Sequence, residues 1–311
     1  MAYPYLTFGR YMRQRFGERV HKISLHAGMT CPNRDGSKGI GGCTFCNNAT
    51  FSPNSRVELD IVGQIAKDKQ RLTRRFRARK FLAYFQSYTN TYADVETLRR
   101  LYDMTLSDPD VIGMSVGTRP DCVPDEVLAL LAGYQAQGHE IWLELGLQST
   151  FDDSLARVNR GHGFAEYEDA VERARKFGLK LCTHLIVGLP GEAPEDTLIS
   201  FDRVMALGTD SIKIHPLHVV RGTQLAREWK RGDYQPIGFD DYVRVVSEII
   251  LRAPDDLIFQ RLTGTAGRDL LLAPMWCEHK WPVMNAVEAR LKSITEEGSW
   301  NSSVRRAVTP L

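Results

Sequence analysis

The segment CPNRDGSKGIGGCTFC, residues 31–46, determines how the rest of the chain is interpreted. It contains three of the chain's six cysteines, with eleven residues between Cys31 and Cys43 and two between Cys43 and Cys46. Three thiolates can hold three irons of a cubane iron–sulfur cluster, which leaves the fourth iron free to bind a small molecule. Four glycines lie between the cysteines, and they let the backbone wrap closely around such a cluster. The segment therefore predicts an iron–sulfur site.

Two other uses of these cysteines have to be weighed. A structural zinc ion takes four Cys or His ligands, and His26 could supply the fourth. Disulfides are disfavoured because the first residues lack the apolar core of a signal peptide, which indicates a reducing, cytoplasmic environment. Spacing and glycine content favour the cluster, and zinc remains the alternative.

The composition limits the classes of protein to which the chain can belong. A chain of 311 residues, 43% of them hydrophobic, can form a sizeable core as one large domain or two small ones. No apolar run approaches the roughly 18 residues that a membrane-spanning helix needs, so we expect no membrane association. The net charge of +2 is nearly neutral, but basic residues gather at 10–22 and more densely at 67–80.

Strands alternate with helices along the first 221 residues. Short apolar segments predict strands at 21–26, 80–86, 111–117, 139–147, 179–187 and 211–217. Helical spacing predicts helices at 6–16, 58–76, 94–106, 124–136, 153–158, 164–177 and 195–206, with Asp94 as an N-cap. Six such parallel βαβ units, without a seventh or eighth, predict an α/β fold with an incomplete barrel.

Residues 222–311 are expected to form a C-terminal α/β extension that packs on the barrel core of residues 1–221. The same patterns predict a helix at 239–252, a strand at 257–262 and a helix at 284–296 in this extension.

The cysteine segment resembles the radical S-adenosylmethionine (SAM) superfamily, in which an aromatic residue also precedes the last cysteine, as Phe45 does here. The commonest spacing in that superfamily is C-x3-C-x2-C. The longer first gap, with CPNRDG and GGCTFCNNATF, resembles the YhcC/YtqA family of the Elp-like branch. Further similar segments are E-x-G-x-Q-S at 144–149, N-x-G-H at 159–162, G-L-P-G-E at 188–192 and K-x-H-P-L at 213–217. The resemblance implies a partial (βα)6 barrel of the TIM type.

The same resemblance implies two cofactors, a [4Fe-4S] cluster on Cys31, Cys43 and Cys46, and SAM on its open iron. Function in such barrels gathers at the carboxyl ends of the strands. The polar segment after the second strand therefore becomes a candidate SAM contact, through Gln86, Ser87 and Asn90. Many members carry a glycine pair there, which this chain lacks, and an ordinary polar loop is the alternative.

Four more residues are candidates for binding SAM. Glu144 and Gln148 belong to the fourth strand, where a buried carboxylate needs a partner, either the amine of SAM or substrate or an arginine inside the barrel. Arg160 could bind the SAM carboxylate with its guanidinium fork. Gly188 could let the backbone approach the adenine edge, although strand-to-helix geometry alone also explains a glycine in that turn.

Three residues are candidates for catalysis. Lys213 and His215 point to the same face of the sixth strand, because side chains alternate with period two. Either could move a proton or anchor an anionic substrate, and a structural role is an equal alternative. Cys122 follows the third strand and is expected to face the cavity mouth, where it could donate a hydrogen atom.

The resemblance implies reductive cleavage of SAM and abstraction of a substrate hydrogen, with electrons from a partner such as flavodoxin or ferredoxin. Elp-like relatives act on the tRNA wobble uridine, and the YtqA side is associated with trimming its carboxymethylaminomethyl group to aminomethyl. The basic segment 67–80 is consistent with phosphate contacts, and equally with a solvated helix face. The alternatives are a small-molecule or porphyrin-like substrate, or a non-catalytic iron–sulfur sensor or zinc-binding RNA adaptor.

Overall fold

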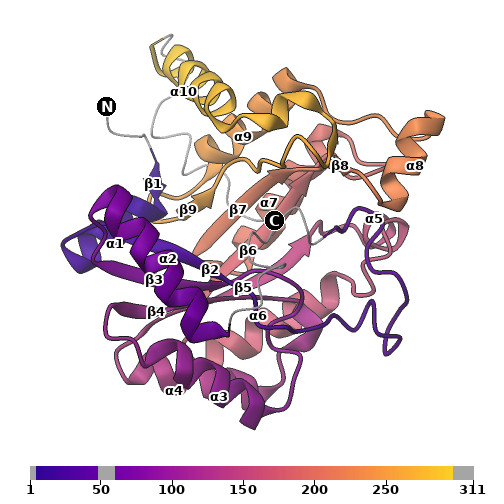
Figure 1. Cartoon of the computed structure of the whole chain (residues 1–311). Helices are drawn as coiled ribbons and strands as arrows, with labels where there is room; N and C mark the ends of the chain where they lie inside the picture. Colours follow the sequence, from indigo (N-terminus) through magenta and orange to yellow (C-terminus); the bar gives the residue numbers. More distant parts are fainter. Residues whose placement is uncertain (1–4, 48–59, 297–311) are drawn as a thin grey trace.

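Eight parallel strands form one curved sheet in the computed structural model, which describes residues 5–47 and 60–296 (Figure 1). The strand order is β1-β9-β7-β6-β5-β4-β3-β2. The bounds are β1 (Leu6–Thr7), β2 (Val20–Leu25), β3 (Lys80–Phe85), β4 (Val111–Thr118), β5 (Glu140–Gln148), β6 (Lys180–Val187), β7 (Ser211–Pro216) and β9 (Ile258–Arg261). The six strands predicted for the barrel core are confirmed within one or two residues.

Helices cover the outside of this sheet, as the alternating pattern predicted. They are α2 (Ile61–Phe76), α3 (Val95–Leu106), α4 (Asp125–Ala136), α5 (Asp152–Arg157), α6 (Phe164–Lys176) and α7 (Pro194–Ala206). The predicted cap is confirmed, since the Asp94 carboxylate accepts a hydrogen bond from the backbone N–H of Thr97 at 2.8 Å. The start of the helix expected from residue 58 lies partly outside the described residues.

The N-terminal segment was predicted as one helix, and this was wrong for its first two residues. Leu6 and Thr7 form β1 and pair with Ile258 and Phe259 of β9. The helix α1 (Phe8–Phe16) then begins because the Thr7 hydroxyl accepts a hydrogen bond from the backbone N–H of Arg10 at 3.2 Å. A cap of this kind ends the extended conformation and starts the helix.

Helix α1 closes the end of the barrel at which the strands begin. Met12 is buried with Trp142, the third residue of β5. The Tyr11 hydroxyl donates to Glu140 Oε1 at 3.0 Å, and Arg15 Nε lies 2.6 Å from Glu140 Oε2. One face of this basic helix therefore plugs the barrel, which leaves the opposite end open for a site.

The C-terminal part adds a small second layer. Strands β8 (Val219–Val220) and β10 (Leu271–Ala273) pair antiparallel. The helices there are α8 (Gln224–Arg231), α9 (Phe239–Arg252) and α10 (Lys280–Glu296), with a short 3-10 helix at Met275–Glu278. Another short 3-10 helix, Pro120–Cys122, follows β4 in the barrel core. The predicted helix at 239–252 is confirmed, the last helix begins four residues before the predicted start, and α8 and the two short strands were not predicted. No helix among the described residues combines the length and apolar character needed to cross a membrane.

Candidate cofactor-binding cavity

A cavity lies among the carboxyl ends of the parallel strands, where the sequence predicted the site. All three members of the cysteine triad, Cys31, Cys43 and Cys46, line this cavity. The cavity is also lined by Gln86, Gln148, Arg160, His184, His215 and Arg261, among others. The structure thus brings together the predicted triad, two predicted glutamines, Arg160 and His215.

The spacing of the thiols distinguishes a cluster from a single zinc ion. Among residues 5–47 and 60–296, the one group of three Cys, His, Asp or Glu side chains with ligand atoms all within 4.8 Å is Glu144, Cys182 and His184. Zinc–sulfur bonds of about 2.3 Å keep the sulfurs around one ion closer than about 4.6 Å. The triad, with or without His26, is not among such groups, so its sulfurs are not gathered around the position of one zinc ion.

Burial would keep the Cys46 thiol protonated without metal. The pKa of Cys46 is raised by burial and by neighbouring Cys43. Metal coordination deprotonates such thiols, and the Arg160 guanidinium, with Nη1 3.5 Å from Cys43 Sγ, would stabilise the resulting negative charge. The donor set and its surroundings thus fit an anionic cluster.

The turn after α5 is tied to the cysteine loop. The Asn159 side chain donates to the Gly42 carbonyl at 2.9 Å, and the Thr44 N–H donates to the Val158 carbonyl at 3.0 Å. Arg160 is thereby placed beside Cys43, and its Nη2 also donates to the Gly146 carbonyl. These contacts hold Arg160 between the cysteine loop and β5.

Gly146 allows this close approach. A Cβ at position 146 would lie 2.9 Å from Arg160 Nη2 and 2.9 Å from Gln148 Nε2, closer than real Cβ atoms come. The glycine of the E-x-G-x-Q-S segment therefore lets two predicted SAM-binding side chains converge.

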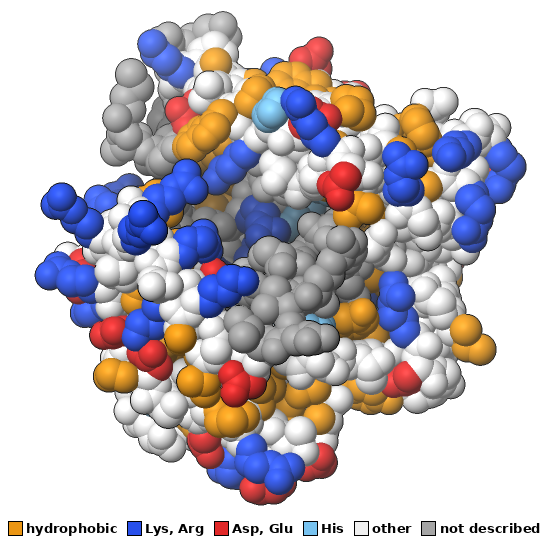
Figure 2. All heavy atoms as spheres, in the orientation of Figure 1, with side chains coloured by type: hydrophobic (Ala, Val, Ile, Leu, Met, Phe, Trp, Pro, Cys, Tyr) orange, Lys and Arg blue, Asp and Glu red, His pale blue; other side chains and the backbone are white. Residues whose placement is uncertain are grey.

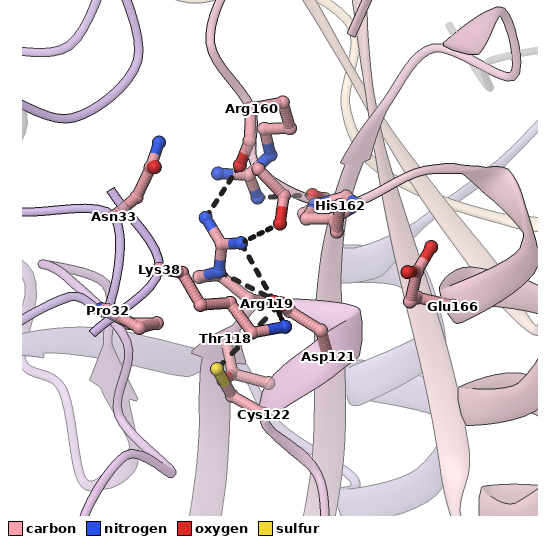
Figure 3. A network of polar contacts seen from close by, with 12 residues as sticks. Pro32, Asn33, Lys38, Thr118, Arg119, Asp121, Cys122, Arg160, His162 and Glu166 are labelled. Atoms are coloured by element: carbon pink, nitrogen blue, oxygen red, sulfur yellow. Dashed lines mark hydrogen bonds and ion pairs between the residues drawn. The ribbon is translucent and has the colours of Figure 1, made fainter. Parts of the chain in front are cut away.

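Arg119, which the sequence analysis missed, supports Arg160 from below. It is 2% exposed, and Nε and Nη2 each lie 2.9 Å from an Asp121 carboxylate oxygen (Figure 3). Its Nη1 donates to the Arg160 carbonyl at 2.8 Å, and Lys38 of the cysteine loop reaches Asp121 at 2.6 Å. Its position directly after β4, at a strand end, was the available signal.

Glu144 and Lys213 do not line the cavity but lie one layer deeper inside the barrel. Glu144 is fully buried and accepts hydrogen bonds from Lys213, from His184 at 3.0 Å and from Lys22 at 3.3 Å. Lys213 also donates to the Tyr84 hydroxyl at 2.9 Å. The carboxylate of Glu144 thus has partners within the protein, as the structural alternative expected, but they are lysines and a histidine rather than an arginine.

Three predicted SAM contacts lie apart from the cavity lining. Asn90 is buried, and its amide donates to the Gly117 carbonyl at 2.8 Å. Ser87 is also buried, two residues after β3. Gly188 borders a different hollow, where its carbonyl accepts a hydrogen bond from Tyr234 at 2.7 Å. These residues shape strand ends around the cavity, and their contact with SAM stays a prediction.

Cys122 borders a second hollow rather than the cavity of the triad. Burial and the neighbouring Asp121 carboxylate raise the pKa of its thiol to about 12, so it is protonated at neutral pH (Figure 3). Its predicted role as a hydrogen donor would require substrate to reach this second hollow.

Four histidines, two of them buried and two half-buried, make stability depend on pH. Burial, with nearby Arg160 and Arg119, lowers the pKa of His162 to about 3. Burial also lowers the pKa of His184 and of His218 to about 4, and that of His215 well below its usual range. An unfolded histidine has a pKa near 6.5, so below that pH the unfolded state binds more protons than the folded state. The free energy of unfolding should therefore fall as the pH drops from about 6.5 towards 4.

Changing His162→Gln should weaken this dependence. The substitution removes one proton from the difference in proton binding between the unfolded and folded states. The slope of the free energy of unfolding against pH, between about pH 4 and 6, should therefore decrease by about 1.4 kcal/mol per pH unit. Urea unfolding at several pH values measures the slope, and the exposed His279→Gln variant is the control. An unchanged slope in His162→Gln would show that this ring is protonated in the folded protein.

Comparison with known proteins identifies the class. The model of the Radical SAM superfamily matches residues 31–204, more than half of the chain, and the model of the Radical_SAM C-terminal domain matches residues 209–293. The chain therefore belongs to the radical SAM superfamily, and it is a radical SAM enzyme. That membership implies a [4Fe-4S] cluster and SAM as its cofactors.

The relatives place the chain in the YhcC/YtqA family. It is 46% identical over 292 residues to protein YhcC of Escherichia coli (strain K12), which covers 94% of each chain. It is 37% identical over 292 residues to YtqA of Bacillus subtilis (strain 168), covering 93% of this chain and 90% of the relative.

Elp3-like proteins are more distant relatives. The chain is 30% identical over 140 residues to a tRNA uridine(34) acetyltransferase of Methanocaldococcus infernus, covering 44% of this chain and 25% of that protein. The solved structure of archaeal Elp3 from Methanocaldococcus infernus, truncated at its N-terminus, superposes with a TM-score of 0.63 at 19% identity. That superposition covers 90% of this chain and 63% of the Elp3 chain, and it confirms the partial-barrel fold.

Changing Arg160→Ala or Gln148→Ala should weaken SAM binding while the cluster remains. Loss of a hydrogen bond to a charged group costs about 1.5–3 kcal/mol, or roughly 10–150-fold in affinity for Arg160. Equilibrium titration of SAM against anaerobically reconstituted protein measures this, with iron analysis as the check on the cluster. Unchanged SAM affinity in both variants would contradict their assignment.

Proposed function

We propose that this radical SAM enzyme modifies the wobble uridine of tRNA, converting a carboxymethylaminomethyl group to an aminomethyl group. The observation that carries the proposal is the similarity to a tRNA uridine(34) acetyltransferase. That similarity covers less than half of this chain, so the acetyltransferase activity itself is not part of the proposal. The proposal takes from this relative only the kind of substrate, a uridine at position 34 of tRNA.

The protein's own residues would have separate roles in the proposed reaction. When bound, the cluster and SAM supply an organic radical that removes a hydrogen atom from the substrate. The triad would hold the cluster, Arg160 and Gln148 would orient SAM, and the buried barrel interior would exclude water. Reduction would come from a partner such as a flavodoxin or ferredoxin, for which Cys31 and Cys46 lie at half-buried positions.

The proposed reaction balances without a further oxidant. The methylene carbon between the amine and the carboxylate would lose a hydrogen atom and an electron, and the amine nitrogen would lose its proton, which together give an imine. The resulting imine is hydrolysed by water to the aminomethyl group and a two-carbon oxo acid. One SAM is consumed for each turnover.

Nucleoside mass spectrometry of total tRNA from a strain lacking this gene tests the proposal. The carboxymethylaminomethyl nucleoside should accumulate at the expense of the aminomethyl nucleoside, and expression of the wild-type chain should reverse the change. An unchanged nucleoside profile would reject tRNA modification and favour the small-molecule or porphyrin-like substrate.

The basic segment at the end of α2 gives a second test. Arg74, Arg75, Arg77 and Arg79 are exposed, and Lys and Arg side chains gather over α1 and α2 (Figure 2). Residues 77–79 lead into the start of β3, so they lie at the end of the barrel opposite the triad. A strand of six residues spans about 20 Å, and a substrate as large as tRNA could contact both ends.

Neutralising these four arginines together should weaken tRNA binding and flatten its salt dependence. Each lost phosphate contact removes about 0.7–0.9 units of the log–log slope, so up to about 3–4 units are expected. Titrating wild-type and quadruple-variant protein with tRNA over a salt series measures both slopes. Identical slopes would mean that these arginines only cover a solvent-facing helix.

A further inference from the structure

The cavity has two unlike walls. One wall contains the cysteine loop, which follows β2, and Gln86, which directly follows β3. Gln148 at the end of β5 and Arg160 in the turn after α5 complete this wall. The opposite wall is formed by β6, β7 and β9, which follow β5 in the sheet. Its polar side chains, here called the His–Arg wall, are His184, His215, His218 and Arg261.

The cavity as a whole attracts anions. Its described lining contains four arginines and no Asp or Glu. Three of these arginines are held by the protein: Arg34 donates to the Cys46 carbonyl at 2.8 Å, Arg119 pairs with Asp121, and Arg160 donates to the Gly146 carbonyl. Such contacts fix the guanidinium groups and satisfy part of their donor capacity.

Arg261 differs from the other three. It is half-buried at the end of β9, and no hydrogen bond or ion pair joins its guanidinium group to any residue within 5–47 or 60–296. Beside it, His218 is 6% exposed, and its Nε2 is buried without a hydrogen-bond partner in the same part of the chain. The His–Arg wall therefore offers a charged fork and an imidazole nitrogen that the described protein leaves unused.

The layer beneath the cavity cannot neutralise Arg261. Glu144 is the carboxylate of that layer, and it is shared by Lys213 and Lys22. Two lysines thus surround this one carboxylate, so it is not available to Arg261.

The backbone closes tightly behind this wall. A Cβ at Gly264 would lie 2.9 Å from His215 Nδ1 and 3.3 Å from His218 Cε1. The rings of His184 and His215 also lie 6.0 Å apart. The imidazoles are therefore held in place by close neighbours.

We propose that Arg261, assisted by His218, binds the carboxylate of the substrate in this cavity. The inference rests on the proposed function, since the carboxymethylaminomethyl group ends in a carboxylate. With SAM against Arg160 and Gln148, the His–Arg wall is the side that remains for substrate. A guanidinium binds a carboxylate with two parallel hydrogen bonds, which also fixes its orientation.

This contact would determine which hydrogen is removed. The methylene that loses a hydrogen atom is bonded directly to the carboxylate carbon. Anchoring the carboxylate on β9 therefore fixes the methylene within the cavity. The product lacks the carboxylate, so the same contact would favour release of the aminomethyl form.

The test compares two tRNA probes, one with carboxymethylaminomethyl and one with aminomethyl at the wobble uridine. Both are titrated against reconstituted enzyme in its wild-type, Arg261→Met and Arg261→Lys forms. Arg231→Met, on exposed α8, is the control. Wild-type enzyme should prefer the carboxylate probe by roughly 10–100-fold, the strength of a hydrogen-bonded contact between charged groups. Arg261→Met should abolish this preference, and Arg261→Lys should reduce it, because lysine keeps the charge but lacks the fork.

The outcomes separate the inference from the proposed function. If wild-type enzyme binds neither probe, the proposed tRNA reaction fails. If wild-type enzyme binds both probes equally, no side chain binds the carboxylate and the inference about Arg261 fails. If the wild-type preference persists in Arg261→Met, only the role of Arg261 is wrong. Equal weakening of both probes would mean a phosphate contact, and weaker SAM binding would mean a contact with SAM, either of which overturns the inference. If Arg261→Met does not fold, as judged by thermal unfolding, the Arg261→Lys variant replaces it in the test. A reduced preference for the carboxylate probe then supports the inference, and an unchanged preference contradicts it.

Discussion

Changing Cys43→Ala is expected to eliminate the iron–sulfur cluster and, with it, SAM cleavage. Cys43 is the most buried member of the triad and lies 3.5 Å from Arg160. Without it, two thiolates would have to hold a cubane that needs three protein ligands. Iron and sulfide analysis after anaerobic reconstitution should fall from about four of each per chain to near zero.

The control for this experiment is Cys277→Ala. Cys277 is even more fully buried, but it packs with Val220 and Leu271, away from the cavity. Its replacement should leave the iron content unchanged. Wild-type protein purified anaerobically with one zinc ion and no iron would refute the cluster assignment, as would full iron content in Cys43→Ala.

Changing Glu144→Gln is expected to cause the largest loss of stability. The neutral amide would leave buried Lys213 and half-buried Lys22 without their carboxylate. Breaking a buried ion pair on one side costs about 3–5 kcal/mol. Urea unfolding should therefore show a much lower free energy of unfolding, while Glu195→Gln, which removes an exposed ion pair with Arg244, should change it little.

A double variant separates the lost charge from lost packing. Replacing both partners of a buried pair by apolar residues is often nearly neutral, so Glu144→Leu with Lys213→Leu should recover part of the stability. Failure of the double variant to improve on Glu144→Gln would mean that Lys22 and His184 determine the cost instead.

The pH dependence of this network has a defined sign. Burial alone would raise the pKa of Glu144, but Lys213 and Lys22 hold it well below its usual range. Its contribution is therefore complete above the unfolded pKa of about 4.3 and is lost as the pH falls through the folded pKa. Glu144→Gln should lack this acid-sensitive part.

Local patterns were sufficient to predict the barrel, because each βαβ unit is encoded within about 30–40 residues of sequence. The pairing of β9 with β7 and β1 was not predictable in this way. Four-residue β9 lies about 45 residues after β7 in the sequence, and its partners are set by the closure of the sheet. Such long-range pairing leaves no periodic signal.

The same difference between local and long-range information explains which residues of the candidate site could be predicted. The triad, Gln148 and Arg160 were predicted because they lie in short recognisable segments at strand ends. The partners of Lys213 could not be predicted, because Glu144 and Tyr84 come from strands remote in the sequence. Arg261 was missed for the same reason, since nothing near it in the sequence shows that β9 borders the cavity.

The pairing of β1 with β9 also constrains how the protein is made. Leu6 and its partner Ile258 are separated by about 250 residues, so the second strand of this pair is synthesised last. At roughly 5–20 residues per second, a ribosome needs about 13–50 seconds to reach Ile258. During that time the first strand has no partner, and the helix that plugs the barrel has no complete barrel to close. The cysteine loop, by contrast, emerges within the first seconds, so we expect a nascent chain to expose its cluster ligands well before the sheet behind them is finished.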